Sequence, residues 1–356
     1  MLFSSFLNFI HPDKRKLLYS LYFKSRYLIV YIFIGIISII FELQIRSFLI
    51  KFGINELKSS IISLPVSIIV AFLLNINFNF KIQRKKIKEA FFFFFLISTT
   101  SLFIQFVLKS NFSLMGNYEI DRMLISGSCF IIFYFLHKNI SFKNYVKVGV
   151  AIYANGVEDI NKIYEKIGPY PDFIHVDIVD ESFLENAPEI KSYKLEVIKA
   201  LWPNKDIQVH IMSKHPSRWI KEVENYADKI FFHFEIDENI EDILEENKIL
   251  KNNLGLAVSV NTEFQNYQKY IKLFNNMLFL AIKKPGYSGQ QFLEKSYSAI
   301  DEINKLTANR KFELSVDGGV NYFNAKNIKS DEIVSGSFIL NNKKPIETLL
   351  KMKFEK

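Results

Sequence analysis

Long apolar segments dominate the first 145 residues of the chain. Four of them approach the roughly 20 residues that a helix needs to cross a bilayer core; they cover residues 27–50, 59–80, 90–108 and 123–140. The preceding residues mix basic, polar and apolar side chains and lack the compact apolar core of a cleavable signal peptide. The sequence therefore predicts an N-terminal segment over 1–26, followed by an all-α transmembrane unit of four helices over 27–143.

Basic residues predict the orientation of this unit. They precede the first span, fill the loop between the second and third spans and follow the fourth: Lys14, Arg15, Lys16, Lys24, Arg26, Lys81, Arg84, Lys85, Lys86, Lys88, Lys138, Lys143 and Lys147. By the positive-inside rule, both ends of the unit are cytoplasmic. The net charge of +8 is thus assigned to membrane topology, with no nucleic-acid partner. A single cysteine, Cys129, excludes an intramolecular disulfide and fits a reducing compartment.

The four predicted spans form two hairpins of two helices each, and the two hairpins end in similar sequences. The end of the second span, FLLNINFNFK, is similar to the end of the fourth, YFLHKNISFK. The arrangement resembles the GtrA-like family of four-span proteins, which is associated with polyprenyl-linked sugars in surface-glycan synthesis. Within the first span, Glu42 and Arg46 stand four residues apart, and we expect them to form an ion pair near the membrane interface.

From Val148 onward, short β-rich runs alternate with amphipathic helical stretches. Eight candidate strands cover residues 148–154, 172–179, 207–212, 229–235, 254–260, 277–283, 312–318 and 332–338. This alternation predicts an α/β fold, a (β/α)8 TIM barrel over 148–356. A doubly wound open sheet is the competing topology.

Polar residues at the strand ends favour the barrel. They are His175, Asp177, His210, His233, Glu235 and Asp317. In a barrel these ends meet on one face, where active sites lie. Two of these imidazoles and two of these carboxylates converging there would suit one divalent metal ion such as zinc, iron(II) or manganese.

Glycine-bearing turns follow the last three strands. They lie in KPGYSGQQF (284–292), SVDGGV (315–320) and SGS (335–337). Glycine lets backbone N–H groups close around an anion, and the loops after strands seven and eight are the usual phosphate site of such barrels. The turns therefore predict a phosphorylated substrate.

HVDIVD, QVHIM, KPGYSGQQF, VDGG and SGS, in this order, resemble ribulose-phosphate 3-epimerase over about residues 148–350. The resemblance implies that Asp177 and Asp317 are the catalytic acid/base pair, and that His175, Asp177, His210 and Asp317 are the metal ligands. It also implies a phosphate site formed by Gly286, Gly289, Gly318, Gly319, Gly336 and Ser337. Where the family has a serine in the first strand this chain has Ala151, and two methionine positions hold Val179 and Ala281, whereas Met212 is kept. Lys283 and Lys284 precede the Pro-Gly turn.

The resulting hypothesis is a membrane-tethered, metal-dependent epimerase that inverts C3 of a pentulose 5-phosphate and serves surface-glycan synthesis. The expected partners are a sugar phosphate, the bilayer and a polyprenyl-linked sugar. The sequence leaves open whether the chain forms a homo-oligomer. A second hypothesis makes the membrane half a glycolipid translocase and the barrel a sugar-phosphate sensor. In a third, the spans are a simple anchor.

Overall fold

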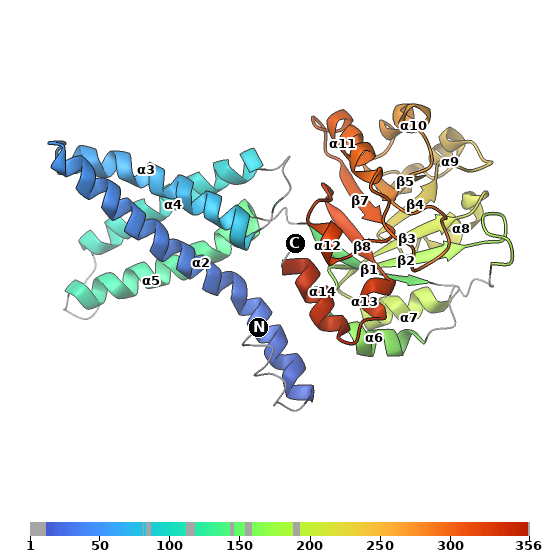
Figure 1. Cartoon of the computed structure of the whole chain (residues 1–356), viewed down its shortest axis with the longest axis horizontal. Helices are drawn as coiled ribbons and strands as arrows, with labels where there is room; N and C mark the ends of the chain where they lie inside the picture. Colours follow the sequence, from blue (N-terminus) through green and yellow to red (C-terminus); the bar gives the residue numbers. More distant parts are fainter. Residues whose placement is uncertain are drawn as a thin grey trace. The chain divides into compact units, whose positions relative to one another are not determined.

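The computed structural model divides the chain into two compact units, residues 1–145 and 146–356 (Figure 1). It describes residues 12–80, 82, 87–111, 118–142, 146–153, 159–187 and 193–354. Part of the predicted segment 1–26 and the basic residues Lys81, Arg84, Lys85, Lys86 and Lys143 lie outside the described residues.

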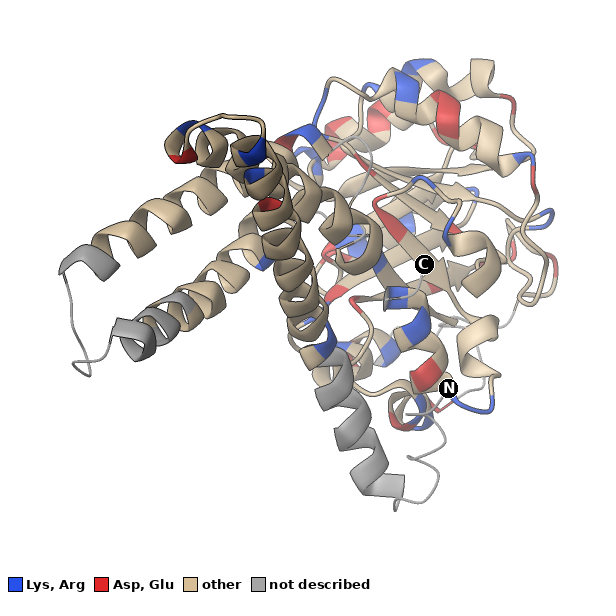
Figure 2. Cartoon of the chain, turned by 60° about the vertical axis from the view of Figure 1, so that its left-hand side comes forward, with Lys and Arg blue, Asp and Glu red and all other residues tan. Residues whose placement is uncertain are grey.

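The first unit contains long apolar helices. They are α2 (Pro12–Lys51), α3 (Glu56–Leu74), α4 (Ile87–Asn111) and α5 (Tyr118–Leu136). Among the residues that the structure describes, three stretches are long and apolar enough to span a membrane: Ser25–Lys51, Glu56–Asn79 and Ile87–Leu108. They coincide with the first three predicted spans. The fourth predicted span lies on α5, where many side chains are not described. In Figure 2 the spans are almost free of charged residues, whereas the barrel carries both signs.

The two similar segments adopt the same local structure. α3 continues into the π-helical turn η1 (Asn75–Asn79), and α5 continues into η3 (His137–Ser141). Each turn carries a side-chain hydrogen bond across its own length, from Asn79 to Asn75 and between His137 and Ser141. The aromatic residues that end the turns, Phe80 and Phe142, stack with ring centroids 4.5 Å apart. The two similar sequences thus form the same kind of π-helical turn at the ends of the two hairpins.

The predicted Glu42–Arg46 ion pair is replaced by contacts between helices. Arg46 pairs with Glu56 at 3.0 Å and donates to Ser60, while Glu42 accepts a hydrogen bond from Ser63 at 2.7 Å. The expectation of a local pair was wrong because the start of α3 offers both side chains partners on a neighbouring helix.

The second unit is a closed barrel of eight parallel strands in sequence order, which confirms the predicted TIM barrel. The strands are β1 Lys147–Tyr153, β2 Phe173–Val179, β3 Asp206–Met212, β4 Lys229–His233, β5 Leu254–Ser259, β6 Asn276–Leu280, β7 Glu313–Asp317 and β8 Glu332–Ser335. The helices around them are α6 Ile160–Ile167, α7 Tyr193–Leu201, α8 Pro216–Val223, α9 Ile240–Glu246, the 3₁₀ turn η4 Lys248–Leu250, α10 Phe264–Ile271, α11 Ser296–Leu306, α12 Tyr322–Ala325, α13 Ser337–Leu340 and α14 Pro345–Phe354.

Helix α6 illustrates why these segments are helical. Asp159 caps its start by accepting a hydrogen bond from the Asn161 N–H, and Gly168 ends it with a φ of 56°. Ile160, Ile163 and Ile167 fall on one face and are buried in the barrel's main apolar core.

Strand β8 is shorter than the predicted stretch 332–338. It ends at Ser335, because Gly336 becomes the N-cap of α13 and the Ser335 hydroxyl donates to the carbonyl of Val320 in the preceding loop. This early end places Gly336 at the N-cap and Ser337 at the first position of α13, where both line the cavity at the mouth of the barrel.

Candidate active site

Four side chains from three strands meet at the carboxyl end of the barrel. β2 supplies His175 and Asp177, β3 supplies His210, and β7 supplies Asp317. One ligand atom from each lies within 4.8 Å of the others. Alternate residues of a strand face the same side, so His175 and Asp177 point together, and the parallel register sets Asp177 opposite His210. The structure thus brings together the four residues predicted as metal ligands.

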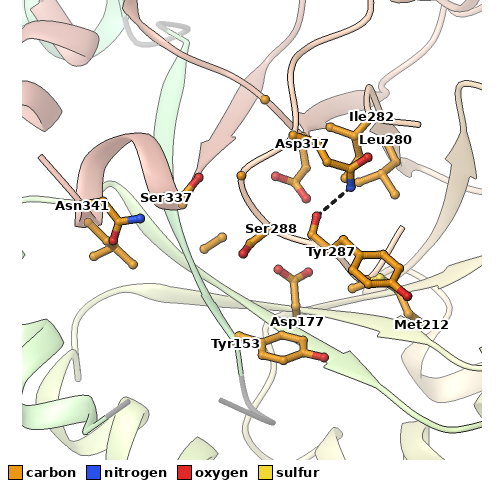
Figure 3. A pocket seen from close by; sticks show the side chains of 18 residues that line it. Tyr153, Asp177, Met212, Leu280, Ile282, Tyr287, Ser288, Asp317, Ser337 and Asn341 are labelled. Carbon is orange, nitrogen blue, oxygen red and sulfur yellow. Dashed lines mark hydrogen bonds between the residues drawn. The ribbon is translucent and has the colours of Figure 1, made fainter. Parts of the chain in front are cut away.

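A cavity of about 330 Å³ opens above these residues (Figure 3). Its walls include Asp177, Asp317 and Met212, and all six predicted phosphate-site residues: Gly286, Gly289, Gly318, Gly319, Gly336 and Ser337. In Figure 3 the carboxylates of Asp177 and Asp317 approach the cavity from opposite sides. The acid/base candidates and the glycine turns therefore share one pocket.

His175 presents an unpartnered nitrogen to the site. The side chain is fully buried. Its Nδ1 lies 3.4 Å from Oε1 of Gln208, while Nε2 lies 3.5 Å from Asp177 and makes no hydrogen bond to the part of the chain that the structure describes. A buried polar atom without a partner is costly, so this nitrogen is suited to an external ligand.

Asp177 lies between two imidazoles. Its Oδ1 is 2.9 Å from Nδ1 of His210. Burial opposes ionisation of Asp177, but the neighbouring His175 and His210 outweigh burial and hold the pKa of the carboxyl well below its usual range. Burial, the main cause, lowers the pKa of His210 to about 4. At neutral pH Asp177 is therefore ionised beside a neutral His210.

The pKa of Asp317 is displaced in the opposite direction to that of Asp177. Burial, together with the negative charge of Asp177, raises its pKa to about 7. Two carboxyl groups facing one cavity are thus set apart in proton affinity, which is the arrangement expected of an acid/base pair.

The donor set suits a divalent transition metal. Two imidazoles and two carboxylates within one small cluster match the mixed N/O coordination of zinc, iron(II) or manganese. The unpartnered Nε2 of His175 is the observation that favours a bound cation over a purely structural cluster.

The glycine turns fit their predicted place around the pocket. Gly319 has a φ of 68°, and a Cβ there would overlap backbone atoms of Gln291 and Phe292 in the loop after β6. Gly289 has a φ of 76° on that same loop. These conformations favour glycine and bring two backbone segments close together at the cavity wall.

Three residues outside the predicted set also belong to this region. Tyr153 lines the cavity together with Ala151. The two residues are two positions apart on β1 and therefore face the same side, so the sequence could have identified Tyr153 as a lining residue. His233 at the end of β4 contacts His210, with Nε2 atoms 2.9 Å apart, and Glu235 contacts His233. The sequence places both at a strand end but does not assign them to the site, since nothing in it reveals that His233 contacts His210.

The departures from the family pattern fall in different places. Ala151 and Met212 line the cavity. Val179 is buried beneath the loop that carries Gly286. Lys283 and Lys284 are exposed and are not among the lining residues, so their charges lie outside the pocket wall.

Comparisons with known proteins agree with this geometry. Residues 148–340 match the Ribulose-phosphate 3 epimerase family, and residues 30–143 match the GtrA/DPMS transmembrane domain. Ribulose-phosphate 3-epimerase of Chlamydia pneumoniae is 29% identical over 178 residues, covering 47% of this chain and 76% of the relative. The chloroplastic ribulose-5-phosphate-3-epimerase of Arabidopsis thaliana is 27% identical over 195 residues, covering 52% and 68%. The enzyme of Aquifex aeolicus is 28% identical over 181 residues, covering 48% and 79%.

Both predicted resemblances are confirmed. The chain belongs to the ribulose-phosphate 3-epimerase family, with an epimerase-like barrel of the isomerase class joined to a GtrA-like membrane domain.

Proposed function

We propose that the barrel is a metal-dependent epimerase that inverts C3 of a pentulose 5-phosphate, interconverting D-ribulose 5-phosphate and D-xylulose 5-phosphate or a close relative. The observation that carries this proposal is the placement of Asp177 and Asp317 on opposite sides of one cavity that also contains the glycine turns. A sugar-phosphate sensor would need no opposed acid/base pair, so this placement favours the enzyme over the sensor.

The two carboxyl groups account for inversion. The hydrogen at C3 is acidified by the neighbouring C2 carbonyl, so a carboxylate on one face can remove it and leave an enediolate. A carboxyl group on the other face then returns a proton to C3. In the metal-free chain the pKa of Asp177 is lowered and that of Asp317 is raised to about 7, so the two carboxyl groups differ in proton affinity. A single group would restore the starting sugar.

His175, Asp177, His210 and Asp317 would hold the metal ion. When bound, a divalent cation supplies Lewis-acid stabilisation for the enediolate oxygens. The imidazoles contribute neutral nitrogen ligands, and the two aspartates contribute the charge that balances the cation.

The six turn residues would hold the phosphate. No Lys or Arg is among the described residues that line the cavity, so recognition would depend on backbone N–H groups rather than on charge. Gly318, Gly319 and Gly336 carry no side chain that would fill this space, and Ser337 adds a hydroxyl.

The membrane unit would place the enzyme at the cytoplasmic face. We propose four spans with both ends of the unit in the cytoplasm, because the basic residues listed above flank the expected cytoplasmic ends. We propose that the unit connects the barrel to polyprenyl-linked sugars in surface-glycan synthesis, as the resemblance to the GtrA-like family implies; the part of the comparison that supports this is the match to the GtrA/DPMS transmembrane domain.

The test uses the purified full chain in detergent, loaded in turn with zinc, iron(II) and manganese, and follows interconversion of the two pentulose phosphates. We expect turnover that a chelator removes and that Asp177→Asn or Asp317→Asn reduces by about 10²- to 10⁴-fold. Glu238→Gln, which changes a carboxylate that accepts hydrogen bonds from Ser217, is the control. Unchanged turnover in either aspartate variant would refute the acid/base assignment.

A further inference from the structure

A line of four side chains runs from the cavity into the barrel wall behind His210. Asp177 Oδ1 lies 2.9 Å from Nδ1 of His210, Nε2 of His210 lies 2.9 Å from Nε2 of His233, and Nδ1 of His233 lies 2.8 Å from Oε2 of Glu235. Both imidazoles are fully buried. Each of these three contacts has hydrogen-bond length, so each calls for one shared hydrogen or one shared cation.

Counting hydrogens shows that the line lacks one. A neutral imidazole has a single N–H and one accepting nitrogen, and an ionised carboxylate only accepts. His210 and His233 together supply two N–H groups for three contacts. With both imidazoles neutral, one contact in the line therefore joins a nitrogen lone pair to an acceptor, and either a further proton or a cation completes it.

Glu235 determines which contact that is. Its Oε1 accepts hydrogen bonds from the Ser259 N–H and the Thr262 hydroxyl. Burial opposes ionisation, but His233, and to a lesser extent Thr262 and Ser259, outweigh burial and lower the pKa of Glu235 to about 2. As an ionised acceptor, Glu235 requires the N–H of His233 at Nδ1. When His210 gives its Nδ1 lone pair to a cation, its N–H is at Nε2, and the Nε2 of a neutral His233 lies 2.9 Å away to accept it.

We propose that His233 and Glu235 are positioning residues that fix the tautomer of His210, so that this ligand presents Nδ1 to a divalent cation between itself and Asp177. The inference rests on the proposed metal-dependent function and extends it to residues outside the ligand set.

A parallel arrangement orients the other imidazole, through different residues. The Oε1 of Gln208 faces Nδ1 of His175, and its Nε2 donates to Glu332 at 2.6 Å. Glu332 is held in turn by Lys229 at 3.0 Å. Because Glu332 fixes the amide orientation, Gln208 accepts the N–H of His175 and leaves Nε2 as the free nitrogen. The two histidines thus present opposite ring nitrogens to the same site.

The test measures Mn²⁺ affinity of the full chain in detergent by electron paramagnetic resonance of the free ion, together with thermal unfolding of the metal-free protein. Removing groups that orient a metal ligand typically weakens binding by about 10- to 100-fold. We expect His233→Leu to show that loss, whereas His233→Gln, whose side-chain carbonyl can still accept from His210, retains most of the affinity. Glu235→Gln, which keeps the shape but removes the ionised acceptor, should also weaken binding.

Glu238→Gln, just beyond Glu235 in the same loop, is the matched control and should bind Mn²⁺ as the wild type does. If His233 had only a structural role, His233→Leu and His233→Gln would have the same lowered unfolding temperature and the same Mn²⁺ affinity. If His233→Leu binds Mn²⁺ with wild-type affinity, the inference about His233 and Glu235 is wrong, while the proposed metal centre stands. If His233→Leu does not fold, Glu235→Gln provides the same test. Failure of the wild type to bind Mn²⁺, Zn²⁺ or Fe²⁺ would overturn the proposed metal centre as well.

Discussion

At the scale of single residues, two chemically identical side chains acquire different properties from their surroundings. Asp177 has two imidazoles beside it and is held ionised, whereas burial and the charge of Asp177 raise the pKa of Asp317 to about 7. The residue identities could be predicted from the motifs in the sequence. Their opposite pKa displacements could not, because these depend on the burial and separation of groups from strands far apart in the chain.

The pKa of Asp317 predicts a pH dependence of metal binding. A carboxyl with a raised pKa is protonated below about pH 7 and must lose that proton to bind a cation. Affinity should therefore increase with pH up to about 7 and fall by at least about tenfold for each pH unit below it, because Asp177 outweighs burial and raises the pKa of His175 as well. Titration calorimetry in two buffers of different ionisation enthalpy would count the released proton at pH 6 and at pH 8. Equal proton release at both values would contradict the assignment.

At the scale of elements, the barrel's strand order brings the site together. The two strand-end motifs on β2 and β3 pair directly, and β7 reaches them only because the sheet closes between β1 and β8. Alternating apolar runs sufficed to predict eight strands, and helices such as α6 follow from their buried isoleucines. The contact between His210 and His233 was missed because it depends on how far side chains reach between neighbouring strands, which periodicity does not specify.

The loops after β6 and β7 pack against each other at Gly319, which gives a prediction for this pair of elements. Gly319→Ala should destabilise the barrel by about 1–3 kcal/mol, because it forces a side chain into a positive φ and against the backbone of Phe292. It should also raise KM for the sugar phosphate. Gly127→Ala, where a Cβ meets nothing within 4 Å, is the control. Unfolding temperature and KM that match the wild type would contradict the role given to this turn.

At the scale of the whole molecule, the two units have separate cores. The main apolar cluster of the barrel contains only residues from 148 onward, while aromatic residues such as Phe72, Phe94 and Phe142 form the principal cluster of the helical unit. Composition alone predicted this division, because the apolar segments end where the strand and helix alternation begins.

Separate cores predict that residues 146–356 fold without the membrane unit. This part should be soluble, bind the same metal and turn over substrate as the full chain does, because the residues that build its cavity lie within it. Activity and circular dichroism of the truncated protein would check this. Aggregation of the truncated protein, or loss of its turnover, would show that the barrel depends on the helices.

The predicted orientation is tested in membranes. Basic residues at the expected cytoplasmic ends of the unit predict that a protease reaches the barrel in inside-out vesicles but not in intact spheroplasts. Digestion of the barrel from the outer face would contradict the cytoplasmic placement.

The most direct test of the account follows ribulose 5-phosphate with the metal-loaded full chain in D₂O, by nuclear magnetic resonance of the product. Proton removal by one carboxylate and return by the other predicts xylulose 5-phosphate that carries deuterium at C3, formed by the wild type and lost in Asp177→Asn and Asp317→Asn. Product that retains the original hydrogen at C3, or undiminished deuterium incorporation in both variants, would contradict two-carboxylate epimerisation.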